Sequence, residues 1–300
     1  MEIIKNWLTA FRLRTLPLAL SSIILGGFLS ANDHQFNLLV TSLAVVTTIL
    51  LQILSNLAND FGDFKAGTDN ENRVGPTRSV QGGAISEKSM KKAIYFFIGL
   101  SLVCGSTLIY LSVHDMSYLN LFVFFILGVL AIAAAVNYTM GNNPYGYKGY
   151  GDFFVLIFFG FVGVLGTYYL NTHALSSDLF WPALSLGLLS TAVLNLNNMR
   201  DIENDKQSGK HTLVVKYGSS KAKKYHIIIV SMALLAAINF SYQHFESYFQ
   251  FLFLLTVPLF IKDLIQISKN KNPKDLDPFL KKQAIHTLLF SITFGLGLIL

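Results

Sequence analysis

Two short acidic motifs in the sequence each place a pair of aspartates about one helical turn apart. The first contains Asp60 and Asp63, at spacing i, i+3, and the second contains Asp201 and Asp205, at spacing i, i+4. On a helix, residues at these spacings share one face and are close enough to share a cation. Because Mg²⁺ binds through carboxylates together with water and substrate phosphates, we predict that these four aspartates are magnesium ligands and catalytic residues.

Basic residues follow both motifs closely. Arg73 and Arg78 come after the first motif, and Lys210 comes after the second. Arginine presents a fork of donors that matches phosphate oxygens, and lysine supplies a compact positive charge. Carboxylates beside basic side chains indicate a site for Mg²⁺ and a diphosphate, and we predict that these three residues bind the phosphates.

Amide side chains accompany the aspartates at the ends of otherwise apolar segments. Asn56 and Asn59 accompany the first pair, and Asn198 precedes the second. An amide at hydrocarbon depth costs free energy and usually faces a cavity or a partner helix. We predict that these three asparagines contact the substrate. The alternatives are hydrogen bonding between helices and, for the aspartates, ordinary solvated loop charges.

Two further regions contain candidate binding residues. Tyr147 and Lys148 lie in a segment rich in glycine and tyrosine, which either lines a pocket for an acceptor or forms an aromatic belt at the membrane interface. Arg12 and Arg14, near the N-terminus, either anchor the chain to lipid headgroups or reach the acidic cavity. Histidine and cysteine form no cluster, and no phosphate-binding or dinucleotide-binding glycine motif is present, so zinc and nucleotide chemistry has no support.

The elements that must position these side chains are long apolar segments. Of the 300 residues, 52% are hydrophobic and 13% are charged, against about 25% charged in soluble proteins. The apolar runs have roughly the 20 residues that cross a bilayer as a helix. We therefore predict an all-α membrane protein, a single membrane-embedded domain over residues 1–300. Its nine expected spans are 16–31, 37–58, 93–112, 119–140, 153–170, 179–199, 225–241, 248–267 and 283–300.

Positive charges alternate from one loop to the next. The loops that carry the acidic motifs are rich in Lys and Arg, whereas the four loops on the opposite side contain neither. The positive-inside rule then places the N-terminus and both motifs on the cytoplasmic side of the cell (inner) membrane, and the C-terminus outside. The net charge of +6 is thus explained by orientation and by anionic lipid headgroups, and no nucleic-acid partner is expected.

The two motifs resemble those of the UbiA superfamily of intramembrane prenyltransferases, which read roughly NDxxD and DxxxD. They stand here as residues 59–63 and 201–205, and the resemblance extends over essentially the whole chain. It implies a nine-transmembrane-helix bundle of the UbiA type, with a central cavity that opens to the cytoplasmic side. It also implies that Mg²⁺ and a polyprenyl diphosphate are bound there.

Other stretches resemble the branch of the superfamily that acts on 1,4-dihydroxy-2-naphthoate. They are residues 12–17, 56–69, 75–83, 147–152 and 209–213. The resemblance implies prenyl transfer to this aromatic acid with decarboxylation, giving demethylmenaquinone, with Arg14, Lys148 or Tyr147 near the acceptor. Asp152 stands where a glutamate is expected in that branch. The alternatives are another aromatic acceptor, a membrane transporter and a non-catalytic protein on the same scaffold.

Overall fold

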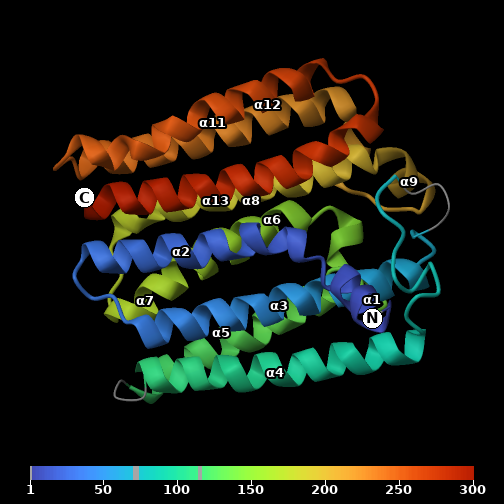
Figure 1. The fold of residues 1–300 in the computed structure, drawn as a ribbon, viewed down its shortest axis with the longest axis horizontal. Coiled ribbons are helices and arrows are strands. Elements are labelled where there is room, and N and C mark those ends of the chain that lie inside the picture. Colours follow the sequence, from blue (N-terminus) through green and yellow to red (C-terminus); the bar gives the residue numbers. More distant parts are fainter. Residues whose placement is uncertain (1, 70–73, 114–116) are drawn as a thin grey trace.

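The computed structural model describes residues 2–69, 74–113 and 117–300, and these residues are mainly helical (Figure 1). The longer helices are α1 (Glu2–Phe11), α2 (Leu16–Asn32), α3 (Leu38–Lys65), α4 (Glu87–Val113), α5 (Tyr118–Asn137), α8 (Phe180–Arg200), α11 (Ser219–Gln243), α12 (Val257–Lys269) and α13 (Asp277–Ile299). The shorter ones are η1 (Leu13–Thr15), η2 (Tyr145–Lys148), α6 (Gly151–Val155), η3 (Leu156–Leu165), α7 (Gly166–Thr172), η4 (Ser177–Leu179), α9 (Ile202–Gln207), α10 (Leu213–Tyr217), η5 (Tyr248–Thr256) and η6 (Pro273–Leu276).

Within the described residues, nine helical segments are long and apolar enough to cross a membrane, which confirms the predicted number of spans. Several helices extend further than the apolar runs that predicted them. For example, α3 continues past residue 58 to Lys65, and α4 begins at Glu87 rather than at residue 93. Backbone hydrogen bonds continue a helix beyond the apolar stretch that hydropathy detects. As a consequence, Asp60 and Asp63 both lie on α3 rather than in a loop.

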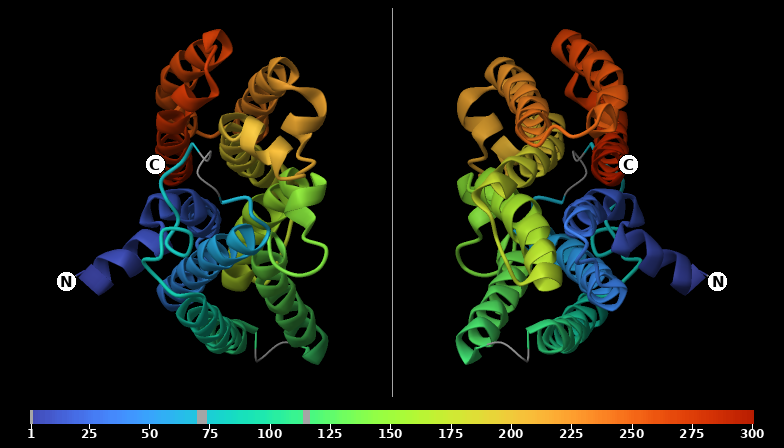
Figure 2. Two further views of the ribbon diagram at one scale, coloured as in Figure 1. Left: turned by 90° about the vertical axis from the view of Figure 1, so that its right-hand side faces the viewer. Right: turned by 90° about the vertical axis from the view of Figure 1, so that its left-hand side faces the viewer.

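The long helices lie side by side, with α9 and the loop before α4 at the same end of the bundle (Figure 1). When the bundle is viewed nearly along its helices, they surround a central region (Figure 2). The closest neighbours include α8 with α11, α2 with α13, and α3 with α4. A cluster of buried phenylalanines, Phe253, Phe260, Phe290 and Phe294, joins η5 and α12 to α13.

The π-helical segment η3 is held tightly between two neighbouring helices. A Cβ atom on Gly160 would lie 2.7 Å from the carbonyl oxygen of Ala183 on α8, so only glycine permits this approach. On the other side, the hydroxyl of Ser22 on α2 donates a hydrogen bond of 2.5 Å to the carbonyl of Phe159. These contacts fix η3 as a rigid wall at the centre of the bundle.

A cavity of about 830 Å³ runs through the centre of the bundle, and η3 forms part of its lining. Along α3 its lining extends from Ala44 to Asp63, about 28 Å of helix at 1.5 Å per residue. This length is close to the ~30 Å thickness of a bilayer's hydrocarbon core. The lining is mostly apolar, but the end that carries the two acidic motifs is polar.

Candidate functional site

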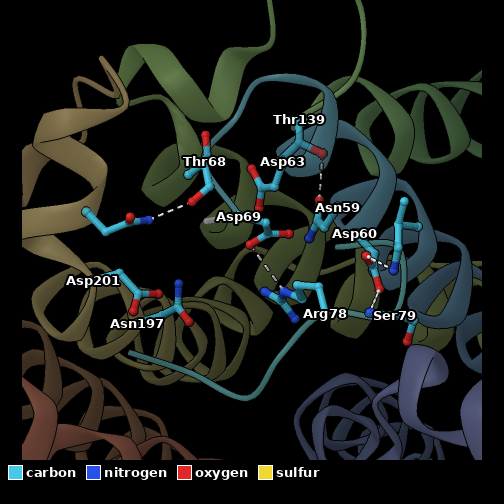
Figure 3. A network of polar contacts seen from close by, with 12 residues as sticks. Asn59, Asp60, Asp63, Thr68, Asp69, Arg78, Ser79, Thr139, Asn197 and Asp201 are labelled. Carbon is cyan, nitrogen blue, oxygen red and sulfur yellow. Dashed lines mark hydrogen bonds and ion pairs between the residues drawn. The ribbon is translucent and has the colours of Figure 1, made fainter. Parts of the chain in front are cut away.

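Asp63, labelled in Figure 3 near the end of α3, lines the cavity, and its carboxylate contacts Lys210, which follows the second acidic motif. Its Oδ1 accepts a hydrogen bond of 2.8 Å from the hydroxyl of Tyr147 and lies 3.1 Å from the Nζ atom of Lys210. The Tyr147 hydroxyl also lies 2.6 Å from the hydroxyl of Thr68. Residues far apart in the sequence therefore meet at one carboxylate.

The two motifs end in the same kind of helix cap. Gly67 and Gly209 follow the helices with φ of +71° and +73°, in the left-handed region that favours glycine. The backbone N–H groups of Thr68 and Lys210 then each donate to the carbonyl five residues back, at 2.9 Å in both cases. This is the hydrogen bond of a Schellman cap, and it turns the chain so that Thr68 and Lys210 face the cavity.

Asp201 is held by its neighbour in the sequence, Arg200. The Nε and Nη2 atoms of Arg200 donate to the two carboxylate oxygens of Asp201 at 2.9 and 2.6 Å. Its Nη1 donates to Asp277, on the first turn of α13, at 2.6 Å, and its Nη2 donates to Asn197 at 2.9 Å. Because each carboxylate oxygen has a second lone pair, Asp201 can still bind a cation from the cavity.

Arg200 was not expected from the sequence as a site residue. An arginine at the end of an apolar span is ordinarily interpreted as an anchor to headgroups, but this side chain is only 2% exposed. The signal that could have identified it is its position between an amide-rich span and an aspartate that is a candidate metal ligand.

Lys210 lies among carboxylates and above an aromatic ring. Its Nζ is 3.6 Å from Asp205 and 4.7 Å from the ring centre of Tyr147. Burial alone lowers the pKa of Lys210, but the negative charges of Asp63 and Asp205 outweigh burial and raise that pKa above its usual value. Lys210 is therefore a fixed positive charge at the polar end of the cavity.

Asp69 and Arg78 complete the polar end of the cavity. Both line it, and the Nε atom of Arg78 lies 3.6 Å from Oδ1 of Asp69 (Figure 3). Asp69 was not among the predicted ligands, because it follows the helix end and has no helical spacing to the aspartates before it. The turn at Gly67 brings it to the cavity.

Comparison with known proteins identifies the family. Residues 19–291 match the model of the UbiA prenyltransferase family. The chain belongs to the UbiA prenyltransferase family. It is 46% identical, over 100% of its length and 97% of the relative's, to the 1,4-dihydroxy-2-naphthoate octaprenyltransferase of Haemophilus influenzae. It is 42% identical, over 98% of its length and 95% of the relative's, to the protein of the same name from Escherichia coli.

Solved structures of the family share the fold. A UbiA homolog from Archaeoglobus fulgidus, bound to GPP and Mg²⁺, superposes with a TM-score of 0.67 at 16% identity. The match covers 98% of this chain and 99% of that one. The UbiA fold is therefore established for this chain.

Asp60 does not face the cavity of this UbiA-family bundle. Its carboxylate accepts hydrogen bonds from the backbone N–H groups of Ser79 and Val80, at 3.1 and 3.3 Å (Figure 3). The side chain is buried and is absent from the cavity lining. The three-residue spacing gives the two aspartates of α3 different directions here: one meets the loop before α4, and the other meets the cavity.

The other predicted residues, apart from Asn56, divide into three groups. Asn59, Asn198, Tyr147, Arg78 and Lys210 line the cavity, as do Asp63, Asp201 and Asp205. Arg14 and Lys148 are exposed and do not line it, and Arg73 lies outside the described residues.

Asn56 does not line the cavity. Its amide makes hydrogen bonds to a neighbouring segment, which is the alternative to substrate contact that the sequence left open. Its Nδ2 donates to the carbonyl of Phe11 at 2.9 Å and to the hydroxyl of Thr15 at 3.0 Å. The amide therefore ties α3 to the segment that joins α1 to α2. Of the two arginines considered in that segment, Arg12 lines the cavity and Arg14 does not.

The donor set at the polar end fits Mg²⁺ that shares its coordination with a substrate. Among the described residues, no three His, Cys, Asp or Glu side chains stand close enough to hold a metal by themselves. The four predicted aspartates therefore do not surround a single ion in this structure. The cavity nevertheless presents oxygen donors, the ligand type that Mg²⁺ prefers together with water and phosphates. They include Oδ1 of Asn204, which is buried without a hydrogen-bond partner in the described part of the chain.

Asp205 gives the site a measurable pH dependence. Burial, together with the charges of Asp201 and Asp63, raises the pKa of Asp205 to about 6, although Lys210 opposes the shift. Between about pH 4 and this value the folded state holds a proton that the unfolded state has lost, so stability falls as pH rises.

We therefore expect thermal unfolding of the Mg²⁺-free protein to show stability falling from pH 5 to about pH 6 and levelling off above it. Asp205→Asn should remove this part of the pH dependence, which makes it the control. An unchanged profile in Asp205→Asn would contradict the assignment to Asp205.

Proposed function

We propose that this chain transfers an octaprenyl group from its diphosphate to 1,4-dihydroxy-2-naphthoate, with decarboxylation, and so forms demethylmenaquinol, the reduced form of demethylmenaquinone. The observation that carries the proposal is 46% identity over the full chain to a relative with this named activity. A cavity with one polar end and a long apolar body also matches a diphosphate joined to a hydrocarbon tail.

The side chains at the polar end have distinct roles in this proposal. Asp63, Asp69, Asp201 and Asp205, with neighbouring amides, offer oxygen donors that would hold Mg²⁺ together with the phosphate oxygens of the donor. When bound, Mg²⁺ would neutralise charge on the diphosphate as it leaves. Lys210 and Arg78 lie beside these carboxylates, where they bind the phosphate oxygens and keep them oriented. Asp60 holds the loop that carries Arg78.

The bonds that change follow from the two substrates. The carbon–oxygen bond of the donor breaks, diphosphate departs, and positive charge develops on the allylic carbon. The ring carbon that bears the carboxylate forms the new carbon–carbon bond. Its bond to the carboxyl group then breaks, carbon dioxide leaves, and the electron pair restores the aromatic ring. Tyr145 and Phe154, stacked with centroids 4.0 Å apart, line the cavity and can stabilise the developing cation.

The bundle protects the cation and sets the orientation of the site. Apolar walls exclude bulk water from the reacting carbons. The polar end of the cavity lies at the helix ends where Lys and Arg gather, which supports a cytoplasmic opening, an inside N-terminus and an outside C-terminus. Both halves of the chain contribute to the lining, which supports a single domain.

Release of carboxyl-labelled carbon dioxide tests this function. Membranes containing the protein are incubated with octaprenyl diphosphate, Mg²⁺ and carboxyl-labelled 1,4-dihydroxy-2-naphthoate, with 4-hydroxybenzoate as the comparison acceptor. The expected result is Mg²⁺-dependent release of label with the naphthoate and no prenylated product with the benzoate. Prenylated benzoate would indicate another acceptor class, and no product with either acid would favour the transporter alternative.

A further inference from the structure

The end of the cavity far from the acidic motifs has a different wall from the rest. There α4 joins the lining through Gly105, Leu108 and Ile109, together with Thr47 on α3 and Gly128 on α5. A second cavity of about 30 Å³ lies among the same three helices and shares Thr47, Gly105 and Gly128 with the first. Space therefore remains where α3, α4 and α5 meet.

Neither the backbone nor the packing requires glycine at positions 105 and 128. Neither residue has a positive φ. A Cβ on Gly105 would meet only Thr47, at 3.7 Å, and a Cβ on Gly128 would meet only Ile109, at 3.9 Å. These are ordinary van der Waals distances, unlike the 2.7 Å approach at Gly160. The missing side chains thus leave open volume rather than permit close helix contact.

This volume lies beyond the reach of a short donor. Thr47 lies about 24 Å along α3 from Asp63 at 1.5 Å per residue. At roughly 1.5 Å per carbon–carbon bond, the eight main-chain carbons of a geranyl group extend to at most about 12 Å. An octaprenyl chain is four times as long, so only a long tail whose diphosphate is bound at the acidic end reaches the two glycines.

We infer that Gly105 and Gly128 determine the length of the prenyl chain that the cavity accepts, because they keep its far end open. This inference rests on the proposed function, since it assumes a prenyl diphosphate held at the acidic motifs. Larger side chains at these positions close the space that the distal part of a long tail occupies. The same side chains leave the space for a two-unit tail untouched.

Donor binding tests the inference without the acceptor. The probes are the unreactive thiolodiphosphate analogues of geranyl and octaprenyl donors, with Mg²⁺ and protein in lipid nanodiscs. Gly105→Leu and Gly128→Leu are expected to raise the Kd of the octaprenyl analogue about tenfold or more, with the Kd of the geranyl analogue within about twofold of the wild-type value. The matched control is Gly99→Leu, also on α4, where a Cβ would have no atom within 4 Å and where the residue lines neither of the two cavities described above.

Equal weakening of both analogues, or unchanged octaprenyl binding, would overturn the inference, as would wild-type protein that binds neither. If the leucine variants do not fold, Gly105→Ala and Gly128→Ala are measured with two-, four- and eight-unit analogues. A loss of affinity that grows with chain length then supports the inference, and a uniform loss contradicts it. A wild-type protein that binds the analogues but prenylates no naphthoate would refute the proposed function alone.

Discussion

Replacing Asp63 by Asn is expected to lower kcat/KM roughly a thousandfold while the protein still folds and inserts. The carboxylate of Asp63 accepts the Tyr147 hydroxyl at 2.8 Å and lies 3.1 Å from Lys210, facing the cavity. Asparagine has nearly the same shape, but it removes one negative charge from the position where cation and diphosphate meet. Mg²⁺-dependent prenyl transfer, with size-exclusion chromatography in detergent to verify folding, measures the effect.

Asp60→Asn is the matched control, three residues earlier on the same helix. Its carboxylate accepts two backbone N–H groups of a loop and does not line the cavity. The amide keeps one acceptor oxygen and loses one hydrogen bond, so the expected loss of activity is about tenfold or less. Equal losses in the two variants would mean that Asp60 acts in the reaction, as its place in the sequence motif predicts.

Arg200→Met is expected to raise the Mg²⁺ concentration needed for half-maximal activity roughly 10- to 100-fold. The guanidinium orients Asp201 through two hydrogen bonds and joins it to Asp277 through a third. Arg200 is thus a positioning residue, which acts on the substrate through Asp201. Removing one partner from a buried ion pair also lowers stability by about 3–5 kcal/mol, which thermal unfolding would detect.

The magnesium titration separates positioning from a general loss of stability. Arg200→Lys keeps the charge but cannot form the paired hydrogen bonds, so it should restore stability better than it restores the magnesium response. Lys206→Met, an exposed change on α9, is the control and should leave both measurements unchanged. A normal magnesium response in Arg200→Met would show that Asp201 needs no such support.

The sequence by itself was sufficient for the number of candidate membrane spans among the described residues and for the position of the acidic motifs at the ends of spans. Twenty-residue apolar runs cross a bilayer only as helices, because a backbone in hydrocarbon must satisfy its own hydrogen bonds. Helical spacing also brought Asp201 and Asp205 to the same cavity. Both inferences use local rules, and packing between distant segments does not alter them.

For the other polar residues, the tertiary structure decided which of them face the cavity. Asp60 and Asp63 belong to one motif, yet the loop before α4 supplies backbone donors to Asp60 and leaves Asp63 to meet Lys210. Arg200 became part of the site because α13 brings Asp277 to it. The direction of a side chain at a helix end depends on which donors other segments place nearby, and no local sequence pattern contains that information.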